Sequence, residues 1–356
     1  MEEKKKCEWL SKHYIVIYIV YLLSLFLFWY FWLPFLNFRD ISFYFYLMLV
    51  LAFPVAIIYA IIKKRYQKND KNTKYTAYRF NKRTGKFEKV FKDITVKYQT
   101  NHLIMRGIFL VVCIFLGIII LFNLTGLKIF NAKAYANQLE IKQGNSEDLN
   151  TIFDYDSGEV LLPRIDKDLA FRLAEARLDE YGSQYSIDYD NFTLISVNRN
   201  DKTELIRVTP LEYATPFVAL SRGDKGTIGY IEVNVITQEA KLVAYPDGEG
   251  LKYMPSAIFG KDLDRHIRTN YPTLMYNDKY FEIDNDGNPY WVIPTIKKEI
   301  GVFSGETPNG VLVVDPRSGK MTHYALNDNH KPDWLQRAVD EAVVAKQADV
   351  LFTKTV

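Results

Sequence analysis

A short acidic stretch in the C-terminal half is the part of this sequence closest to a metal-binding motif. Residues 284–288 read Asp-Asn-Asp-Gly-Asn, and calcium loops place carboxylates at alternate positions ahead of a glycine at position 6. With Gly287 at that position, position 12 is Ile293, where a glutamate would normally bind calcium through both oxygens. Asp284 and Asp286 are therefore weak candidates for a metal site, and a turn between two strands explains the same residues.

Other residues that could do chemistry are scattered. The sequence contains no H-E-x-x-H, no paired-cysteine zinc pattern, no G-x-S-x-G and no glycine-rich phosphate loop. No catalytic residue and no cofactor are therefore predicted, and a second group of acidic residues, near position 155, is interpreted as a solvated turn. The residues concerned are the histidines His266, His323 and His330 and the acidic cluster Asp154, Asp156 and Glu159.

Three apolar runs in the N-terminal third would anchor everything that follows. They are residues 14–36, 41–62 and 105–124, and each is close to the roughly 20 residues with which a helix crosses a bilayer. Pro54 interrupts the second run and should kink or locally loosen that helix. The first run lacks the small-residue cleavage site of a signal peptide, so it is interpreted as a retained span. The sequence thus predicts a membrane anchor of three transmembrane helices in residues 1–125.

Charge is distributed unevenly along the chain. Residues 1–125 carry 19 Lys and Arg against 7 Asp and Glu, whereas residues 126–356 carry 26 against 35. Most of the basic residues of the first part lie in the loop 63–102, and cytoplasmic loops of membrane proteins accumulate Lys and Arg. We therefore expect a multi-pass protein of the cell membrane with its N-terminus and this loop in the cytoplasm. Its C-terminal domain should then be extracellular.

The basic loop is interpreted as an orientation signal that also touches anionic lipid headgroups. A loop of this charge could bind nucleic acid instead. The lipid bilayer already accounts for the basic residues, so the bilayer is the expected partner and no nucleic acid is expected. Within the loop, residues 75–91 alternate in polarity around residues 83–86, which predicts a small β-hairpin.

The region after the anchor is predicted to be an α+β domain. Residues 126–149 read as a stalk, and a helix should follow Asp166 as its N-cap, with Ala170 and Ala174 on its buried face and Gly182 at its end. Alternating, β-branched segments then predict an antiparallel sheet with the helix packed on one face. The expected strands are Phe192–Val197, Thr203–Val208, Phe217–Ser221, Gly229–Val235 and Ala240–Tyr245.

An internal repeat organises this domain. Gly229–Tyr245 and Gly310–Leu326 align without a gap, and each reads as strand, tight turn, strand. Two tandem helix-plus-antiparallel-sheet units are therefore predicted. The predicted parts are a first unit at residues 150–249, a second unit at residues 250–331 and a C-terminal helix within residues 332–356 that starts at Pro332.

The last hairpin of each unit carries a pattern like V-x-V-D-x-x-S/T-G. The matching residues are Val314, Asp315, Ser318 and Gly319 in the second unit and Val233, Asn234 and Thr237 in the first. This pattern resembles a motif of the PepSY family of extracytoplasmic modules. In the first unit Gln238 stands where this motif has a glycine. The layout also resembles uncharacterised membrane proteins of Gram-positive bacteria that carry a few N-terminal spans and a duplicated outer domain.

These patterns favour a non-catalytic binding or regulatory module on the outer face of the membrane. The PepSY resemblance implies an envelope protein as its partner, and strand addition at an exposed sheet edge is one mode by which it would bind. Two alternatives stay open. One is an envelope enzyme or metal-dependent hydrolase that uses Asp284, Asp286 and His266, and the other is a transmembrane sensor that signals to the cytoplasmic loop.

Overall fold

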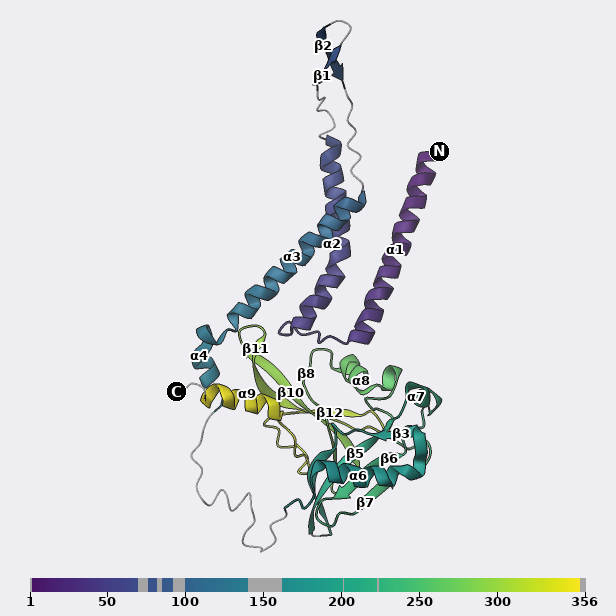
Figure 1. The fold of residues 1–356 in the computed structure, drawn as a ribbon, viewed down its shortest axis with the longest axis vertical. Helices are drawn as coiled ribbons and strands as arrows, with labels where there is room; N and C mark the ends of the chain where they lie inside the picture. The colour runs from purple at the N-terminus through teal and green to yellow at the C-terminus, as the bar shows by residue number, and fades with distance from the viewer. Residues whose placement is uncertain are drawn as a thin grey trace. The chain divides into compact units, whose positions relative to one another are not determined.

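The computed structural model describes residues 2–69, 76–81, 85–91, 100–139, 162–200, 202–222 and 224–352. The chain forms two compact units (Figure 1). Unit 1 comprises Met1–Pro34 and Asp40–Leu124, and unit 2 comprises Phe35–Arg39 and Thr125–Val356. Unit 2 is therefore built from two separate pieces of the chain.

Unit 1 contains three long helices, α1 (Glu2–Trp32), α2 (Ile41–Asn69) and α3 (Thr100–Thr125). Within the described residues, two apolar helical stretches are long enough to cross a membrane, Ile41–Tyr59 and Met105–Thr125. They correspond to the second and third predicted spans.

The first predicted span, residues 14–36, is only partly confirmed. Its apolar helical part, Tyr18–Trp32, is shorter than the other two, and the helix ends at Trp32. Leu33 has a left-handed φ of 51° and precedes Pro34, and a residue before proline is disfavoured in the helical conformation. Two candidate spans and one shorter apolar helix therefore replace the predicted three spans.

A small residue brings α2 and α3 of unit 1 together. Gly107 lies against Ala56, so that a Cβ at Gly107 would press on the Ala56 backbone; small residues of this kind let apolar helices approach closely.

The predicted hairpin of the basic loop is confirmed, because β1 (Thr76–Asn81) and β2 (Lys86–Phe91) pair antiparallel.

Unit 2 contains two five-stranded antiparallel sheets. In the first, β3 and β4 both pair with β5, then β5 pairs with β6 and β6 with β7. In the second, β8 and β9 both pair with β10, then β10 pairs with β11 and β11 with β12. The two sheets therefore share one order of strands along the chain. The strands are β3 (Tyr185–Ile187), β4 (Thr193–Arg199), β5 (Lys202–Tyr213), β6 (Gly229–Asn234), β7 (Ala240–Ala244), β8 (Met275–Tyr276), β9 (Tyr280–Ile283), β10 (Pro289–Ile300), β11 (Ser304–Val314) and β12 (Met321–Ala325).

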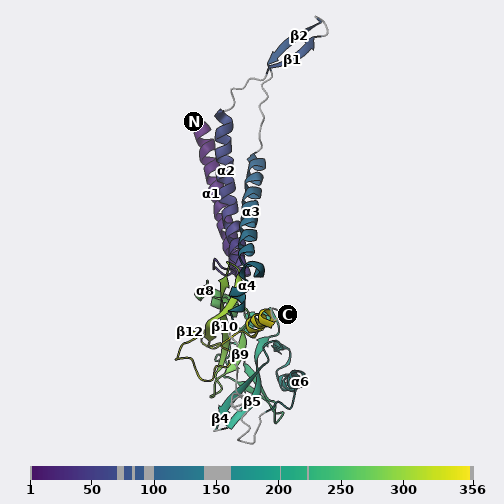
Figure 2. The same ribbon diagram turned by 90° about the vertical axis from the view of Figure 1, so that its left-hand side faces the viewer.

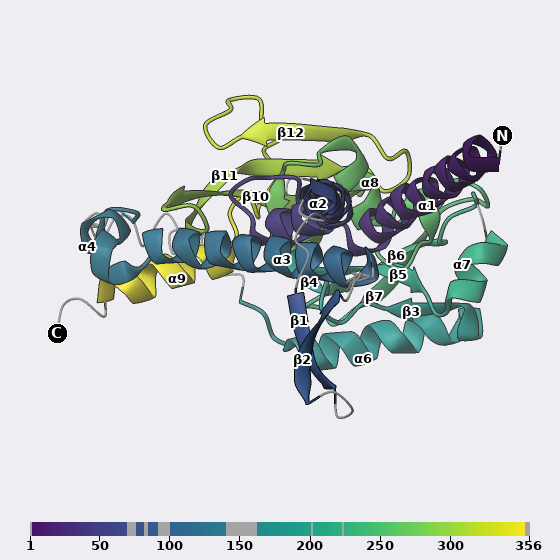
Figure 3. The same cartoon turned by 90° about the horizontal axis from the view of Figure 1, so that it is seen from above.

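Helices flank the two sheets. Helix α6 lies beside β6 and β7 of the first sheet (Figure 3), and Figure 2 shows it next to the sheet that contains β4 and β5. Asp166 accepts a hydrogen bond from the Leu169 N–H at 2.8 Å and so caps α6 as predicted, while Ala170 and Ala174 are buried. The predicted end at Gly182 falls inside a 3₁₀ turn that continues the helix. The helices of unit 2 are α4 (Lys128–Ala136), α6 (Lys167–Leu178), α7 (Pro216–Arg222), α8 (Leu263–Asn270) and α9 (Glu341–Phe352), with 3₁₀ turns η1 (Asp179–Gln184) and η2 (Phe259–Lys261).

The strand predicted at Phe217–Ser221 is wrong, because these residues form helix α7. Thr215 accepts a hydrogen bond from the Val218 N–H through its hydroxyl at 3.3 Å. Pro216 then occupies the first helical position, where its missing N–H has no consequence. A threonine cap followed by proline therefore overrides the β-branched character of the segment.

The C-terminal helix begins at Glu341 instead of Pro332. Asp340 caps it by accepting a hydrogen bond from the Ala342 N–H at 2.8 Å.

The residues ahead of this helix are held across the edges of both sheets. The Glu282 carboxylate of β9 accepts hydrogen bonds from the backbone N–H groups of Gln336 and Arg337 at 3.1 and 3.2 Å. The side-chain amide of Gln336 pairs with both backbone groups of Ser196 in β4, and Arg337 donates to the Leu194 carbonyl at 3.0 Å. These long-range bonds hold the segment in a non-helical path.

The hairpins β6–β7 and β11–β12 make the same turn. Asn234 accepts hydrogen bonds through Oδ1 from the backbone N–H groups two and three residues later, both at 2.9 Å. Asp315 does the same at 2.8 and 3.3 Å. The next residue is left-handed in both turns, Gln238 with φ 66° and Gly319 with φ 76°. The alternating apolar residues of the two hairpins are buried: Val233, Val235, Leu312 and Val314.

One hydrophobic core joins the two sheets. Tyr230 of the first sheet contacts Phe281 of the second with ring centroids 5.9 Å apart, and Phe281 contacts Trp291 at 5.4 Å. All three side chains are buried. The sheets are therefore parts of a single domain.

Candidate functional site

The acidic stretch 284–288 forms the turn between β9 and β10. The Asp284 carboxylate accepts hydrogen bonds from the backbone N–H groups of Asp286 and Asn288 at 3.0 and 2.8 Å, and from the Asn288 side chain at 2.9 Å. Gly287 has a φ of 84°, and its carbonyl accepts a hydrogen bond from the Tyr230 hydroxyl at 2.8 Å. The carboxylate of Asp284 is thus engaged in holding the turn.

His266, the third residue of the hydrolase alternative, lies on α8 instead. Its Nε2 is 2.8 Å from the Gly319 carbonyl oxygen, and its ring lies against Tyr253 with centroids 4.2 Å apart. It therefore links α8 to the turn between β11 and β12. In the part of the chain that the structure describes, no three His, Cys, Asp or Glu side chains meet as a metal site requires.

The other sequence candidates lie apart. His323 of β12 is half-buried with Nε2 3.2 Å from the Thr295 hydroxyl, and burial lowers its pKa. His330 is exposed beside Asp328, 3.0 Å away. The acidic cluster Asp154, Asp156 and Glu159 lies outside the described residues.

An apolar cleft of about 470 Å³ lies beside α7, and we name it the α7 cleft. Leu220 lines it from α7, and Phe217 lies one helical turn earlier on the same helix. Phe217, Leu220 and Phe259 are 83%, 60% and 63% exposed, respectively. The principal lining residues are Tyr213, Leu220, Lys252, Tyr253, Ile258 and Phe259.

Phe259 is held in an unfavourable backbone conformation at the rim of this cleft. Its φ is 54°, a left-handed value that is uncommon for a bulky side chain and costs about 1 kcal/mol. The Arg265 guanidinium donates to its carbonyl at 2.7 Å, and the Asp262 N–H donates to the same oxygen at 3.3 Å. The surrounding turn therefore fixes an exposed phenyl ring in a strained position, as is common at binding sites.

A buried carboxyl group neighbours the lining residue Tyr213 in the chain. Glu212 of β5 accepts hydrogen bonds through Oε2 from both the backbone N–H and the hydroxyl of Ser256, the former at 3.0 Å. The Ser256 hydroxyl oxygen in turn accepts from the Tyr213 N–H at 2.9 Å. Burial raises the pKa of Glu212 to about 7, and within the described ranges its Oε1 has no hydrogen-bond partner. Glu212 thus anchors the loop that forms one wall of the cleft.

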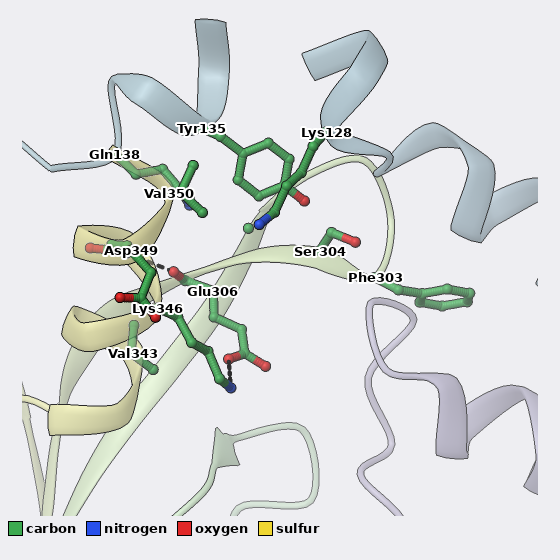
Figure 4. Close-up of a pocket in the computed structure, with 12 residues that line it drawn as sticks. Lys128, Tyr135, Gln138, Phe303, Ser304, Glu306, Val343, Lys346, Asp349 and Val350 are labelled. Carbon is green, nitrogen blue, oxygen red and sulfur yellow. Dashed lines mark hydrogen bonds and ion pairs between the residues drawn. The ribbon is translucent and has the colours of Figure 1, made fainter. Parts of the chain in front are cut away.

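A second pocket of about 370 Å³ lies between α4, the start of β11 and α9 (Figure 4). Lys128 and Tyr135 of α4 point into it, and Lys346 of α9 pairs with Glu306 of β11 at 3.1 Å. The pocket therefore combines both signs of charge with an apolar wall that includes Val350.

No protein-family model matches this chain, and neither a curated protein nor a solved structure is significantly similar to it. These comparisons identify no family for the chain.

Sequence reasoning missed the α7 cleft because it assigned Phe217–Ser221 to a strand. The pair Thr215 and Pro216 was the available signal, since it is typical of a helix start. Neither the exposure of Phe259 nor the burial of Glu212 has a local signature, because both depend on which distant segments pack around them.

Proposed function

We propose that this chain is a membrane-anchored, non-catalytic binding module that engages a protein of the cell envelope through the α7 cleft. The observation that carries the proposal is the exposure of Leu220 and Phe259, which both line the cleft, together with that of Phe217 one helical turn before Leu220. Contiguous exposed apolar surface on a folded domain marks interaction sites, and aromatic anchors dominate the energetics of protein interfaces.

The cleft is a better candidate than the edge of β4 for contact with a partner. Alternate residues of that edge are already hydrogen-bonded: Leu194 and Ser196 to the segment before α9, and the Asn198 N–H to the Asn285 side chain at 2.9 Å. A partner strand would have to displace all of these bonds. An apolar side chain inserted into the α7 cleft displaces only solvent.

Leu220 and Leu162 provide a matched pair for testing the cleft, because both leucines are 60% exposed on unit 2. Membranes that contain the tagged full chain are cross-linked, and the captured proteins are compared among the parent, Leu220→Asp and Leu162→Asp. We expect a discrete envelope protein to be captured by the parent and by Leu162→Asp and lost with Leu220→Asp. Equal capture by all three chains would refute the role of the cleft.

Phe259 allows binding to be separated from folding. Phe259→Gly removes the exposed ring and also relieves the left-handed backbone strain, so it should raise stability by up to about 1 kcal/mol while binding is lost. Thermal melts and the cross-linking yield measure the two effects on the same preparation. A variant that retains the partner would show that the ring is dispensable.

The proposed location is the outer face of the cell membrane, with the N-terminus and the β1–β2 hairpin in the cytoplasm. The charge of residues 63–102 supports this orientation, which requires α1 to cross the bilayer together with α2 and α3. Single cysteines at Asn69 and Glu239, in a chain without Cys7 and Cys113, can be labelled on intact cells with a membrane-impermeant thiol reagent. Labelling at Asn69 but not at Glu239 would reverse the orientation.

We further propose that unit 2 arose by duplication of a PepSY-like unit. Support comes from the shared order of strands and from the identical turns at Asn234 and Asp315. In the gapless alignment these residues pair, as do the left-handed Gln238 and Gly319.

A transmembrane sensor is favoured by one specific observation. The segment between α1 and α2 belongs to unit 2, where Phe35 lies under the buried Arg268 guanidinium at 3.2 Å from the ring centroid. The Leu36 N–H also donates to the Pro272 carbonyl at 2.8 Å. A change in unit 2 would therefore act directly on the chain between two helices. Protease sensitivity of the β1–β2 hairpin that changes in Leu220→Asp, and not in Leu162→Asp, would support signalling.

A further inference from the structure

Unit 2 carries exposed apolar side chains at places where it is covalently joined to an apolar helix. Phe38, between α1 and α2, is 63% exposed. Beyond the end of α3 at Thr125, Ile129 and Phe130 are 85% and 74% exposed. These side chains are separated in sequence from the apolar helices by only a few residues, so the chain itself keeps them near the ends of those helices.

Helix α4 has two distinct faces. One face is turned toward the rest of unit 2. On this face Lys128 and Tyr135 line the pocket shared with α9, and the Tyr135 hydroxyl donates to the Gly126 carbonyl at 2.8 Å (Figure 4). A step of about 100° per residue places Ile129 and Phe130 on the other face. The helix then kinks at Asn131, whose φ and ψ are −122° and 23°, and Lys133 follows the kink. Ile129, Phe130 and Lys133 are all exposed.

The charge of α4 matches an acidic lipid surface. Its sequence contains Lys128 and Lys133 and no acidic residue. Interfacial helices combine an apolar face with basic residues and lie at the boundary between headgroups and acyl chains. The long side chain of Lys133 can reach the headgroups while its methylene groups remain among apolar neighbours.

We propose that α4 is an interfacial helix that places Ile129 and Phe130 in the headgroup–acyl boundary of the bilayer, with Lys133 at anionic headgroups. This inference rests on the proposed membrane anchoring and is independent of the α7 cleft. Phe38 forms a second contact with the same boundary. Unit 2 is then held at the lipid surface by its own side chains as well as by covalent links.

Depth-dependent quenching in lipid bilayers tests this. The full chain without Cys7 and Cys113 receives a single cysteine at Phe130, Ile129, Phe217 or Ile114, is labelled with an environment-sensitive fluorophore and is reconstituted into vesicles with acidic phospholipid. All four side chains are exposed, so labelling leaves the cores intact. Lipids with a shallow spin label should quench the labels at Phe130 and Ile129 about threefold more strongly than the label at Phe217.

The controls separate the two ways of failing. The label at Ile114, within α3, reports insertion through quenching by deeply spin-labelled lipid; if it is not quenched, the membrane anchoring itself fails and the inference falls with it. If Ile114 is quenched but Phe130 and Ile129 behave as Phe217 does towards shallow lipid and a water-soluble nickel chelate, only the interfacial helix is wrong. Protection of Phe130 from both quenchers would assign this face to a protein contact and would also overturn the inference.

Discussion

The two sheets of unit 2 share an order of strands but differ in the connection between their third and fourth strands. In the first sheet, residues 214–228 separate β5 from β6 and carry α7. In the second, residues 301–303 alone join β10 to β11, with Gly301 at a φ of 60°. Surface connections tolerate insertion far better than paired strands do. The comparison therefore places α7, and with it the proposed binding site, in the connection that is longer in the first sheet than in the second.

A second difference lies inside the hairpins. Glu232 of β6 is buried, and Arg199 donates two hydrogen bonds to its carboxylate at 2.8 and 3.2 Å. The aligned residue of β11 is Val313, which is also buried. One strand position therefore holds an ion pair in the first sheet and an aliphatic side chain in the second.

The largest effect is expected at the glycines that open the two hairpins. Gly229 and Gly310 have φ of 154° and 156°, and a Cβ at either would overlap a backbone carbonyl oxygen of the neighbouring strand. Replacing either by valine should lower the free energy of unfolding by about 4 kcal/mol or more. Thermal melts measure the loss, with Gly260→Ala as control because a Cβ there meets nothing within 4 Å. A large loss at only one glycine would break the equivalence of the hairpins.

The ion pair of the first sheet comes next. Arg199→Met leaves the buried Glu232 carboxylate without its main partner and should cost about 3 kcal/mol. Adding Glu232→Val copies the second sheet and should recover most of that loss, because replacing a buried pair by apolar side chains is often neutral. Unfolding of the single and double variants measures the coupling. A double variant no more stable than Arg199→Met would show that this position differs between the sheets in more than charge.

The buried carboxyl group of Glu212 makes stability depend on pH. Glu212 has a pKa of about 7 in the folded chain, raised by burial from 4.5. Between these values the unfolded chain loses its proton while the folded chain keeps it, so this group lowers stability as pH rises from about 4.5 to 7. Glu212→Gln should be more stable than the parent by roughly 2 to 3 kcal/mol at pH 8 and nearly equal to it at pH 4. Melts across this range test the sign, and a parallel shift at all pH values would contradict it.

The smallest effect concerns the residue that departs from the motif. Gln238 adopts the left-handed conformation that Gly319 adopts in the second hairpin, so Gln238→Gly should stabilise the domain by about 1 kcal/mol. The reverse change, Gly319→Gln, should cost more, since a Cβ there would overlap the Tyr253 ring. Melting temperatures of the two variants should therefore move in opposite directions. A loss of stability in Gln238→Gly would indicate that the glutamine side chain has a structural role.

Several features could be read from the sequence because their causes are local. The apolar helices Ile41–Tyr59 and Met105–Thr125 follow from runs of side chains that only a helix can carry across a bilayer. The alternation of β6, β7 and β12, the cap at Asp166 and the turns at Asn234 and Asp315 depend on residues within one hydrogen-bonded turn of each other. The turn at Asp284 was also predicted from the sequence, as the alternative to a metal-binding loop.

Other features were decided only by the tertiary structure, because their partners are distant in the chain. Phe35 joins unit 2 through Arg268, and Gln336 is held in a non-helical path by Ser196 and Glu282. The α7 cleft exists because the strained turn at Phe259 is brought beside α7. A one-dimensional pattern contains the types of these residues but not the long-range hydrogen bonds and packing contacts that fix where each side chain lies.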